Sequence, residues 1–327
     1  MFKMKLPFEE REYSVIMKQE AKSASEYGCA PEKRSIEELL RYGVVNIDKP
    51  KGPTSHQVSD YVKKILHISK AGHSGTLDPG VTGVLPVAIE DATRIVQALL
   101  PAGKEYICVM HLHKDIEEDT LRKELQNWQG IIHQKPPIKS SVRRIVRERT
   151  IYYLDILEIK EKDVLFRIGC QAGTYIRKFC HDVGLKLGGA HMAELRRTKA
   201  GPFAETTLCT LQDLTDALHY YQKGDDHKIR QIIQPIESAV AHLPKVVVFD
   251  STINSLTHGR NLALPGIAQY DSDIKEGDMI AVLSLKGELV CLGTSLLSAT
   301  QMKQEKGVAV NVERVFMKTS TYPRITS

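Results

Sequence analysis

The residues with the clearest chemical potential lie in the segment 71–83, which reads AGHSGTLDPGVTG. It places one carboxylate, Asp78, in a turn rich in glycine and proline, with His73 five residues earlier. Glycine accepts backbone angles that other residues avoid and lets another molecule approach closely, and proline fixes one angle of the turn. The pattern fits a working acid held at a surface turn, but a solvated turn between two strands has the same composition.

The expected secondary structure puts Asp78 in a loop between a helix and a strand. Segment 44–47 is a predicted strand, and a proline–glycine loop follows it. Thr54 and Gln57 stand at the spacing of a helix capping box, and apolar residues then recur on one helical face to about Leu66. Segment 84–89 is the next predicted strand. A further helix is predicted for about 92–100.

Two later segments could bring more chemistry to the same place. Segment 105–113 alternates as a half-buried strand does, with Tyr106 and Cys108 on one face. His111 and His113 share the opposite face, but no acid or cysteine of suitable spacing completes a metal site, so no metal is expected. Segment 174–187 is a predicted helix with Tyr175 and Arg177 in its first turn.

Composition and charge narrow the class of protein. The 327 residues are 42% hydrophobic and 26% charged, as in ordinary globular proteins. Neither a signal peptide nor an apolar run of about 18 residues is present, so no membrane span is expected. Six cysteines without a C-x-x-C pair argue against a zinc site and a disulfide framework, and favour a reducing, cytoplasmic location.

The net charge of +5 is unevenly placed. Segment 135–149 carries six basic residues against one acid, and segment 177–199 carries six against two. A polyanion gripped by the middle of the chain suits this distribution, although a solvated charged face is the commoner cause of any single run. Beyond a boundary near 243–246, short alternating strands predict a small β-barrel or sandwich.

Motifs that the sequence lacks argue against several classes of reaction. Phosphoryl transfer and nuclease action usually show several acids for Mg²⁺, and methyl transfer needs a glycine-rich cofactor loop after a strand. Covalent or acid–base work on a base or sugar by one aspartate remains. An enzyme doing this in structured RNA must extrude its nucleotide and hold it against an aromatic or apolar surface.

Five ordered blocks resemble the TruB-type pseudouridine synthases: NIDKPKGPTSH, AGHSGTLDPGVTGVLPV, KEY at 104–106, GTYIR at 173–177 and ELRR at 194–197. Within that family the chain looks most like the H/ACA-guided dyskerin group. The segments YGCAPEKRSIEELL and QKPPIKSSVRR are similar to theirs, and the unit containing HGRNLALPGI is similar to a PUA domain. Ending at Ser327 without a lysine-rich tail, the chain resembles an archaeal-type member.

The resemblance implies an α+β fold. We expect a catalytic domain over residues 41–243, with a mixed, mainly antiparallel sheet and flanking helices, and a small β-barrel PUA domain over residues 244–327. Residues 1–40 are expected to form an N-terminal extension that packs with the PUA domain.

The resemblance also implies roles for individual residues. Asp78 matches the aspartate that breaks the C1′–N1 bond of the target uridine so that the base rejoins through C5, either by adding to the base or by removing a sugar proton. Tyr106 matches the tyrosine that stacks on the flipped base, with the face of Ile107 left for the core, and Arg177 matches the partner of the aspartate. The expected substrate-binding residues are His73, Tyr175, Leu195 and Lys49.

The expected partners are an H/ACA guide RNA, a substrate RNA (rRNA, with tRNA as a further substrate) and small H/ACA core proteins. No cofactor is implied, because the isomerisation is redox-neutral. The expected guide-RNA contacts are Lys139, Arg143, Arg144, Arg260, Asn261 and Gly266. A stand-alone tRNA synthase and a catalytically idle RNA-binding scaffold are the alternatives.

Overall fold

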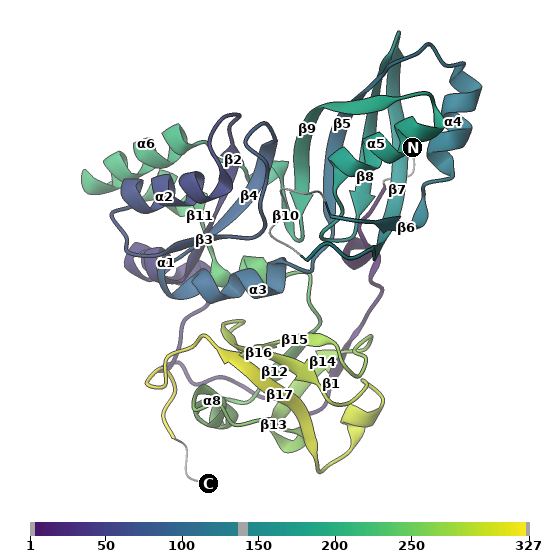
Figure 1. The fold of residues 1–327 in the computed structure, drawn as a ribbon. Helices are drawn as coiled ribbons and strands as arrows, with labels where there is room; N and C mark the ends of the chain where they lie inside the picture. The colour runs from purple at the N-terminus through teal and green to yellow at the C-terminus, as the bar shows by residue number, and fades with distance from the viewer. Residues whose placement is uncertain (1–3, 137–142, 325–327) are drawn as a thin grey trace.

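The fold contains two β-sheets, which a computed structural model describes for residues 4–136 and 143–324 (Figure 1). The larger sheet has ten strands and takes all of them from the region 43–235. The smaller sheet has seven strands, six of them from the region 245–315 and one, β1 (Val15–Met17), from near the N-terminus. The expected α+β class, with mixed and mainly antiparallel sheets, is confirmed.

The ten-stranded sheet has the order β11-β2-β4-β9-β5-β8-β7-β6, with β3 on β4 and β10 on β9. Its neighbours are antiparallel except for the short parallel pairing of β4 with β9. The strands are β2 (Gly43–Lys49), β3 (Ala71–His73), β4 (Thr82–Ile89), β5 (Lys104–Leu112), β6 (Gly130–Gln134), β7 (Arg147–Lys160), β8 (Asp163–Cys170), β9 (Ala190–Ala200), β10 (Phe203–Ala204) and β11 (Ile233–Pro235).

Helices cover this sheet in two groups, α2 with α6 and α4 with α5 (Figure 1). The helices are α1 (Ile36–Tyr42), α2 (Ser55–Ile65), α3 (Val96–Leu99), α4 (Glu118–Gln126), α5 (Ile176–Lys186), α6 (Leu211–Gln222), α7 (His227–Ile232) and α8 (Asp250–Thr257). The predicted capping box of α2 is present, because Thr54 and Gln57 each accept a backbone N–H of the other. The helix predicted near 92–100 is instead a 3-10 helix (Glu90–Ile95) followed by the single turn α3.

The strand β5 buries the face opposite to the one expected. Cys108 and Met110, which share the face of Tyr106, are 1% and 0% exposed and pack in one core with Phe179 of α5. Ile107 remains partly exposed. The expectation that the face of Ile107 forms the core is therefore wrong, because α5 covers the other side of the strand.

The seven-stranded sheet has the order β1-β14-β12-β15-β16-β17-β13. Its strands are β1 (Val15–Met17), β12 (Lys245–Val248), β13 (Leu262–Ala263), β14 (Ile267–Asp271), β15 (Met279–Leu283), β16 (Leu289–Ser295) and β17 (Val308–Val315). β12 and β15 are parallel, and β1 adds an antiparallel edge to β14.

The two sheets share a hydrophobic core at their junction, where α3 lies (Figure 1). Leu99 of α3 belongs to one buried cluster with Leu292 and Phe316 of the C-terminal unit. The N-terminal segment also connects the two units: Glu9 pairs with Lys199 of β9 at 2.8 Å, and Arg11 pairs with Asp271 of β14 at 3.2 Å. Among the described residues, no helix has both the length and the apolar character needed to cross a bilayer.

Candidate active site

Asp78 lies in the β3–β4 loop, and a buried side chain fixes the residue before it. The Ser55 hydroxyl, in the first turn of α2, donates to the carbonyl oxygen of Leu77 at 3.1 Å and accepts its N–H at 2.8 Å. Ser55 and Leu77 are 0% and 3% exposed, whereas the Asp78 side chain is 52% exposed. The carboxylate of Asp78 is therefore exposed to solvent, while the backbone just before it is held in place.

Lys49 holds the same loop from inside the protein. Its ammonium donates to the carbonyl oxygens of Pro50 (2.9 Å), Pro79 (3.2 Å) and Val81 (2.8 Å), and the side chain is fully buried. Burial lowers the pKa of Lys49, and the charge of Asp78 opposes this effect. The expected contact between Lys49 and the substrate is therefore corrected, because all three ammonium protons already have carbonyl partners.

Arg177 pairs with Asp78 across the site. Its Nη2 lies 2.9 Å from Oδ2 of Asp78, and the two side chains are 65% and 52% exposed. Arg177 belongs to the first turn of α5, and Tyr175 is the residue before that helix. The structure thus brings together two residues that lie 99 positions apart in the sequence.

Gln134 of β6 fixes the backbone of Tyr175. Its amide oxygen accepts the N–H of Tyr175 at 3.0 Å, and its amide nitrogen donates to the carbonyl oxygen of Tyr175 at 3.2 Å. Gln134 is 2% exposed. Sequence reasoning missed both Gln134 and Ser55, since a polar residue in an expected strand or helix gives no sign that it bonds a distant backbone.

Tyr106 and Leu195 share one face of the sheet. Tyr106 of β5 lies directly opposite Arg197 of β9, and Leu195 lies opposite Cys108. Both side chains are partly exposed. Burial raises the pKa of Tyr106, while the nearby charge of Arg197 acts in the other direction. The charge of nearby Asp78 also raises this pKa, so the phenol is protonated at neutral pH.

His73, in β3, supplies a neutral ring near the loop. Its ring packs edge-on against His56 of α2, with centroids 4.7 Å apart and planes at 67°. Burial lowers the pKa of His73 to about 4. Its two ring nitrogens have no hydrogen-bond partner within the described part of the chain. Both nitrogens are buried, so His73 is an uncharged ring that packs beside the loop.

The expected guide-RNA contacts divide into exposed cations and structural residues. Arg143, Arg144 and Arg260 are exposed, and Arg144 also donates to the carbonyl oxygen of Pro136 at 3.3 Å. Asn261 accepts the N–H of Val312 of β17 at 3.0 Å. Lys139 lies outside the described residues. At Gly266, an added Cβ would lie 2.7 Å from Thr252, so a larger side chain does not fit there without a shift.

The histidines of β5 have other partners. His111 lies 2.7 Å from Asp163 and His113 lies 3.0 Å from His191. Within residues 4–136 and 143–324, no three histidine, cysteine, aspartate or glutamate side chains are arranged to hold a metal ion.

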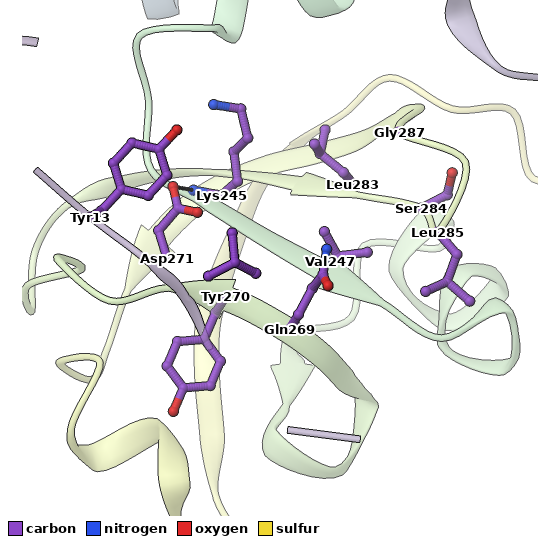
Figure 2. Close-up of a pocket in the computed structure, with 11 residues that line it drawn as sticks. Tyr13, Lys245, Val247, Gln269, Tyr270, Asp271, Leu283, Ser284, Leu285 and Gly287 are labelled. Atoms are coloured by element: carbon purple, nitrogen blue, oxygen red, sulfur yellow. Dashed lines mark hydrogen bonds between the residues drawn. The ribbon is translucent and has the colours of Figure 1, made fainter. Parts of the chain in front are cut away.

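Figure 2 shows a groove elsewhere, on the seven-stranded sheet, with a volume of about 290 Å³. Tyr13, Val247 and Leu283 line it, and the N–H of Lys245 donates to Asp271 beside it at 3.0 Å. None of the expected site residues lines this groove. Asp78 lies elsewhere, in the β3–β4 loop, with its side chain half exposed.

The family follows from comparison with known proteins. Residues 63–119 match the model of the TruB family pseudouridylate synthase N-terminal domain, and residues 177–241 match the tRNA pseudouridylate synthase B C-terminal domain. Residues 3–59 match the DKCLD domain and residues 244–316 match the PUA domain. The chain belongs to the TruB family of pseudouridine synthases, enzymes that isomerise uridine in RNA to pseudouridine.

Particular relatives are similar over almost the whole chain. Proteins named "Probable tRNA pseudouridine synthase B" from Methanopyrus kandleri and Methanosarcina barkeri are 50% and 52% identical, over 98% of this chain and 95% of each relative. The corresponding chain in the crystal structure of a Cbf5-Nop10-Gar1 complex is 51% identical with a TM-score of 0.95, and the match covers 98% of this chain and 99% of that one. The corresponding chain in an H/ACA RNP bound to a substrate RNA containing 2'-deoxyuridine is 49% identical with a TM-score of 0.92 and the same coverage.

Proposed function

We propose that Asp78 carries out the isomerisation on a uridine flipped out of the substrate RNA. The observation that supports this role is the ion pair with Arg177 at 2.9 Å, made by a carboxylate that is half exposed on an anchored loop. A catalytic carboxylate must be reachable by the substrate and held in one geometry. Arg177 keeps a compensating positive charge next to it while the reaction proceeds.

The reaction conserves every atom of the nucleotide. The C1′–N1 bond breaks, the base rotates in its pocket, a C1′–C5 bond forms, and N1 gains a proton as C5 loses one. Asp78 starts the sequence either as a nucleophile on the base or as a base that removes a sugar proton. Both routes start from the carboxylate of Asp78, and Arg177 lies beside it as its ion-pair partner.

The flipped base needs an aromatic and apolar surface to replace its lost stacking. Tyr106 and Leu195 present such a surface on neighbouring strands. Tyr175, fixed by Gln134, adds a ring at the start of α5. His73 is the proposed wedge that helps the nucleotide leave its stack, because a neutral ring can occupy the place of a base.

We propose that the enzyme works as the catalytic subunit of an H/ACA ribonucleoprotein. The solved relatives are about 50% identical and are described as a Cbf5-Nop10-Gar1 complex and as an H/ACA RNP with a substrate RNA. A guide RNA would then select uridines in rRNA, and small proteins of the Nop10 and Gar1 kind would complete the particle. Arg143, Arg144 and Arg260 are the proposed phosphate contacts among the described residues.

The domain limits, 1–40, 41–243 and 244–327, remain proposals. The shared core at the junction means that removing residues beyond about 245 would expose Leu99 and its neighbours. Substitutions of exposed arginines therefore test guide binding more cleanly than a truncation. We place the enzyme in the cytoplasm, because its six cysteines are free and reducing compartments keep thiols in that form.

A second candidate function is guide-independent modification of tRNA, which the names of the curated relatives favour. Mass spectrometry of pseudouridine in tRNA and in rRNA fragments, with and without an H/ACA guide, separates the two. Guide-dependent modification of rRNA is the expected result. Modification of tRNA alone, unaffected by any guide, would replace the first proposal by the second. No activity on either RNA under any condition would favour the idle scaffold.

A further inference from the structure

Arg197 is a buried cation directly beneath the candidate site. Its side chain is 1% exposed. Nε donates to the carbonyl oxygen of Val84 at 2.7 Å and Nη2 donates to that of Gly75 at 3.3 Å. Tyr106 lies directly across from Arg197 on β5, close enough for the two side chains to interact. Burying a charge is costly unless its polar atoms are satisfied, so these contacts are what make its position tolerable.

The three contacts belong to the three pieces that must meet for catalysis. Gly75 lies in the same loop as Asp78, three residues before it, and Val84 lies on β4, the strand that follows this loop. Tyr106 lies on β5, directly across from Arg197. A planar guanidinium presents its donors in a fixed fork. One rigid group therefore sets the spacing between the loop with the carboxylate and the strand with the aromatic ring.

The absence of a side chain at Gly83 lets β4 and β9 come close together. A Cβ there would lie 2.2 Å from the carbonyl oxygen of Arg197, and Gly83 has a φ of +101°, which side chains rarely adopt. The backbone of β4 can therefore approach β9 closely enough for the Arg197 side chain to reach Val84. The contact between Arg197 and Val84 therefore depends on Gly83 as well as on Arg197.

We propose that Arg197 is a positioning residue for the isomerisation, which holds the Asp78 loop and Tyr106 at the separation that the flipped uridine requires. The inference rests on the proposed function of Asp78 and Tyr106. Arg197 touches neither substrate nor reacting atoms. Its effect passes through the carbonyls of Gly75 and Val84 and through the phenol of Tyr106.

The neighbouring residue offers a matched control. Arg196 points to the opposite face of β9, where it pairs with Asp48 at 2.9 Å and with Glu205 at 2.5 Å. Arg196 is on the same strand as Arg197 and carries the same charge, and its guanidinium also has polar partners. Arg196→Met removes as much side chain as Arg197→Met and leaves the bonds to Gly75 and Val84 in place, losing next to the loop only a 3.5 Å hydrogen bond to the Thr82 hydroxyl.

The test measures single-turnover pseudouridine formation and RNA affinity separately, on the assembled guide RNP. Arg197→Met is expected to lower the rate at saturating substrate about a hundredfold, the scale of a displacement of roughly 1 Å, while the dissociation constant of the substrate RNA changes less than about twofold. Arg197→Lys keeps the charge but not the fork, and is expected to recover part of the rate. Arg196→Met is expected to leave the rate near the parent value.

An equal loss of rate in Arg196→Met, or a rate in Arg197→Met that falls only as far as RNA binding falls, would overturn the proposal. If Arg197→Met does not fold, Arg197→Lys decides alone, because a parent rate in that variant contradicts the need for the fork. Asp78→Asn in the same assay separates the two claims. Turnover by Asp78→Asn refutes the proposed function, whereas an inactive Asp78→Asn beside a fully active Arg197→Met refutes only the role of Arg197.

Discussion

The hydroxyl of Ser55 bonds both backbone polar groups of Leu77, a residue 22 positions further along the chain. Leu77 is buried and the next residue, Asp78, is exposed. One side chain at the start of α2 thus fixes the point from which the candidate catalytic carboxylate extends. The position of Asp78 therefore depends on a contact between a helix and a loop as well as on the turn itself.

Ser55→Ala should lower both stability and activity. It leaves the N–H of Leu77 buried without a partner, which costs about 1–3 kcal/mol, and it frees the loop before Asp78. We expect the free energy of unfolding to fall by that amount and the single-turnover rate to fall at least about tenfold. Chemical denaturation and rapid-quench assays measure the two effects.

Ser59→Ala is the control for this change. Ser59 is buried in the same helix, but its hydroxyl donates to the carbonyl oxygen of Ser55 and does not contact the loop. We expect Ser59→Ala to keep the parent rate. A rate loss in Ser59→Ala equal to that in Ser55→Ala would mean that the helix as a whole, and not the Ser55–Leu77 contact, positions Asp78.

Gln134→Leu should weaken the aromatic part of the site. The substitution keeps a similar volume but removes both hydrogen bonds to the backbone of Tyr175. Because Tyr175 directly precedes α5, its displacement should also disturb Arg177. We expect a lower rate with little change in guide-RNA affinity. Gln129→Leu, at a residue whose amide bonds the carbonyl oxygen of Tyr152, is the control and should behave as the parent protein.

Stability should decrease as the pH falls from about 6.5 to about 4. Burial lowers the pKa of His242 to about 4 and that of His73 to about 4. In the unfolded chain these histidines bind protons near pH 6.5, whereas in the folded chain they stay neutral down to about pH 4. Their contribution to stability is therefore complete above pH 6.5 and is lost as the pH falls from 6.5 to about 4. Each histidine contributes up to about 3 kcal/mol on this basis.

His242→Gln tests this pH dependence, since glutamine does not titrate and can keep a donor to the carbonyl oxygen of Ala98. Denaturation measured from pH 7 to pH 4 should show a shallower fall in stability for this variant. His258→Gln, at an exposed histidine, is the control and should retain the parent slope. Parallel curves for the parent and His242→Gln would contradict the assignment to His242.

Local sequence patterns predicted a large part of the fold. The capping box of α2 needs only Thr54 and Gln57, which are close in sequence, and the alternation of β5 follows from the two-residue repeat of a strand. The pattern could not show which face of β5 α5 would cover. For that reason the face of Ile107 was wrongly expected to be the core.

The sequence likewise predicted some residues of the candidate site and not others. Residues expected to touch the substrate come from recognisable blocks, and the structure brings Asp78 and Arg177 together. Ser55, Gln134 and Arg197 act through backbone atoms of distant segments, and no spacing in the sequence encodes such contacts. Lys49 shows the reverse error, because a lysine beside a proline–glycine loop suggests an exposed cation until its carbonyl partners are known.

The central claim, that Asp78 carries the chemistry, is tested most directly by Asp78→Asn in the assembled guide RNP. The substitution keeps the size of the side chain and removes its charge. We expect no pseudouridine by mass spectrometry of the substrate RNA, together with a dissociation constant for that RNA within about threefold of the parent value. Retained turnover, or loss of RNA binding as complete as the loss of product, would contradict the account.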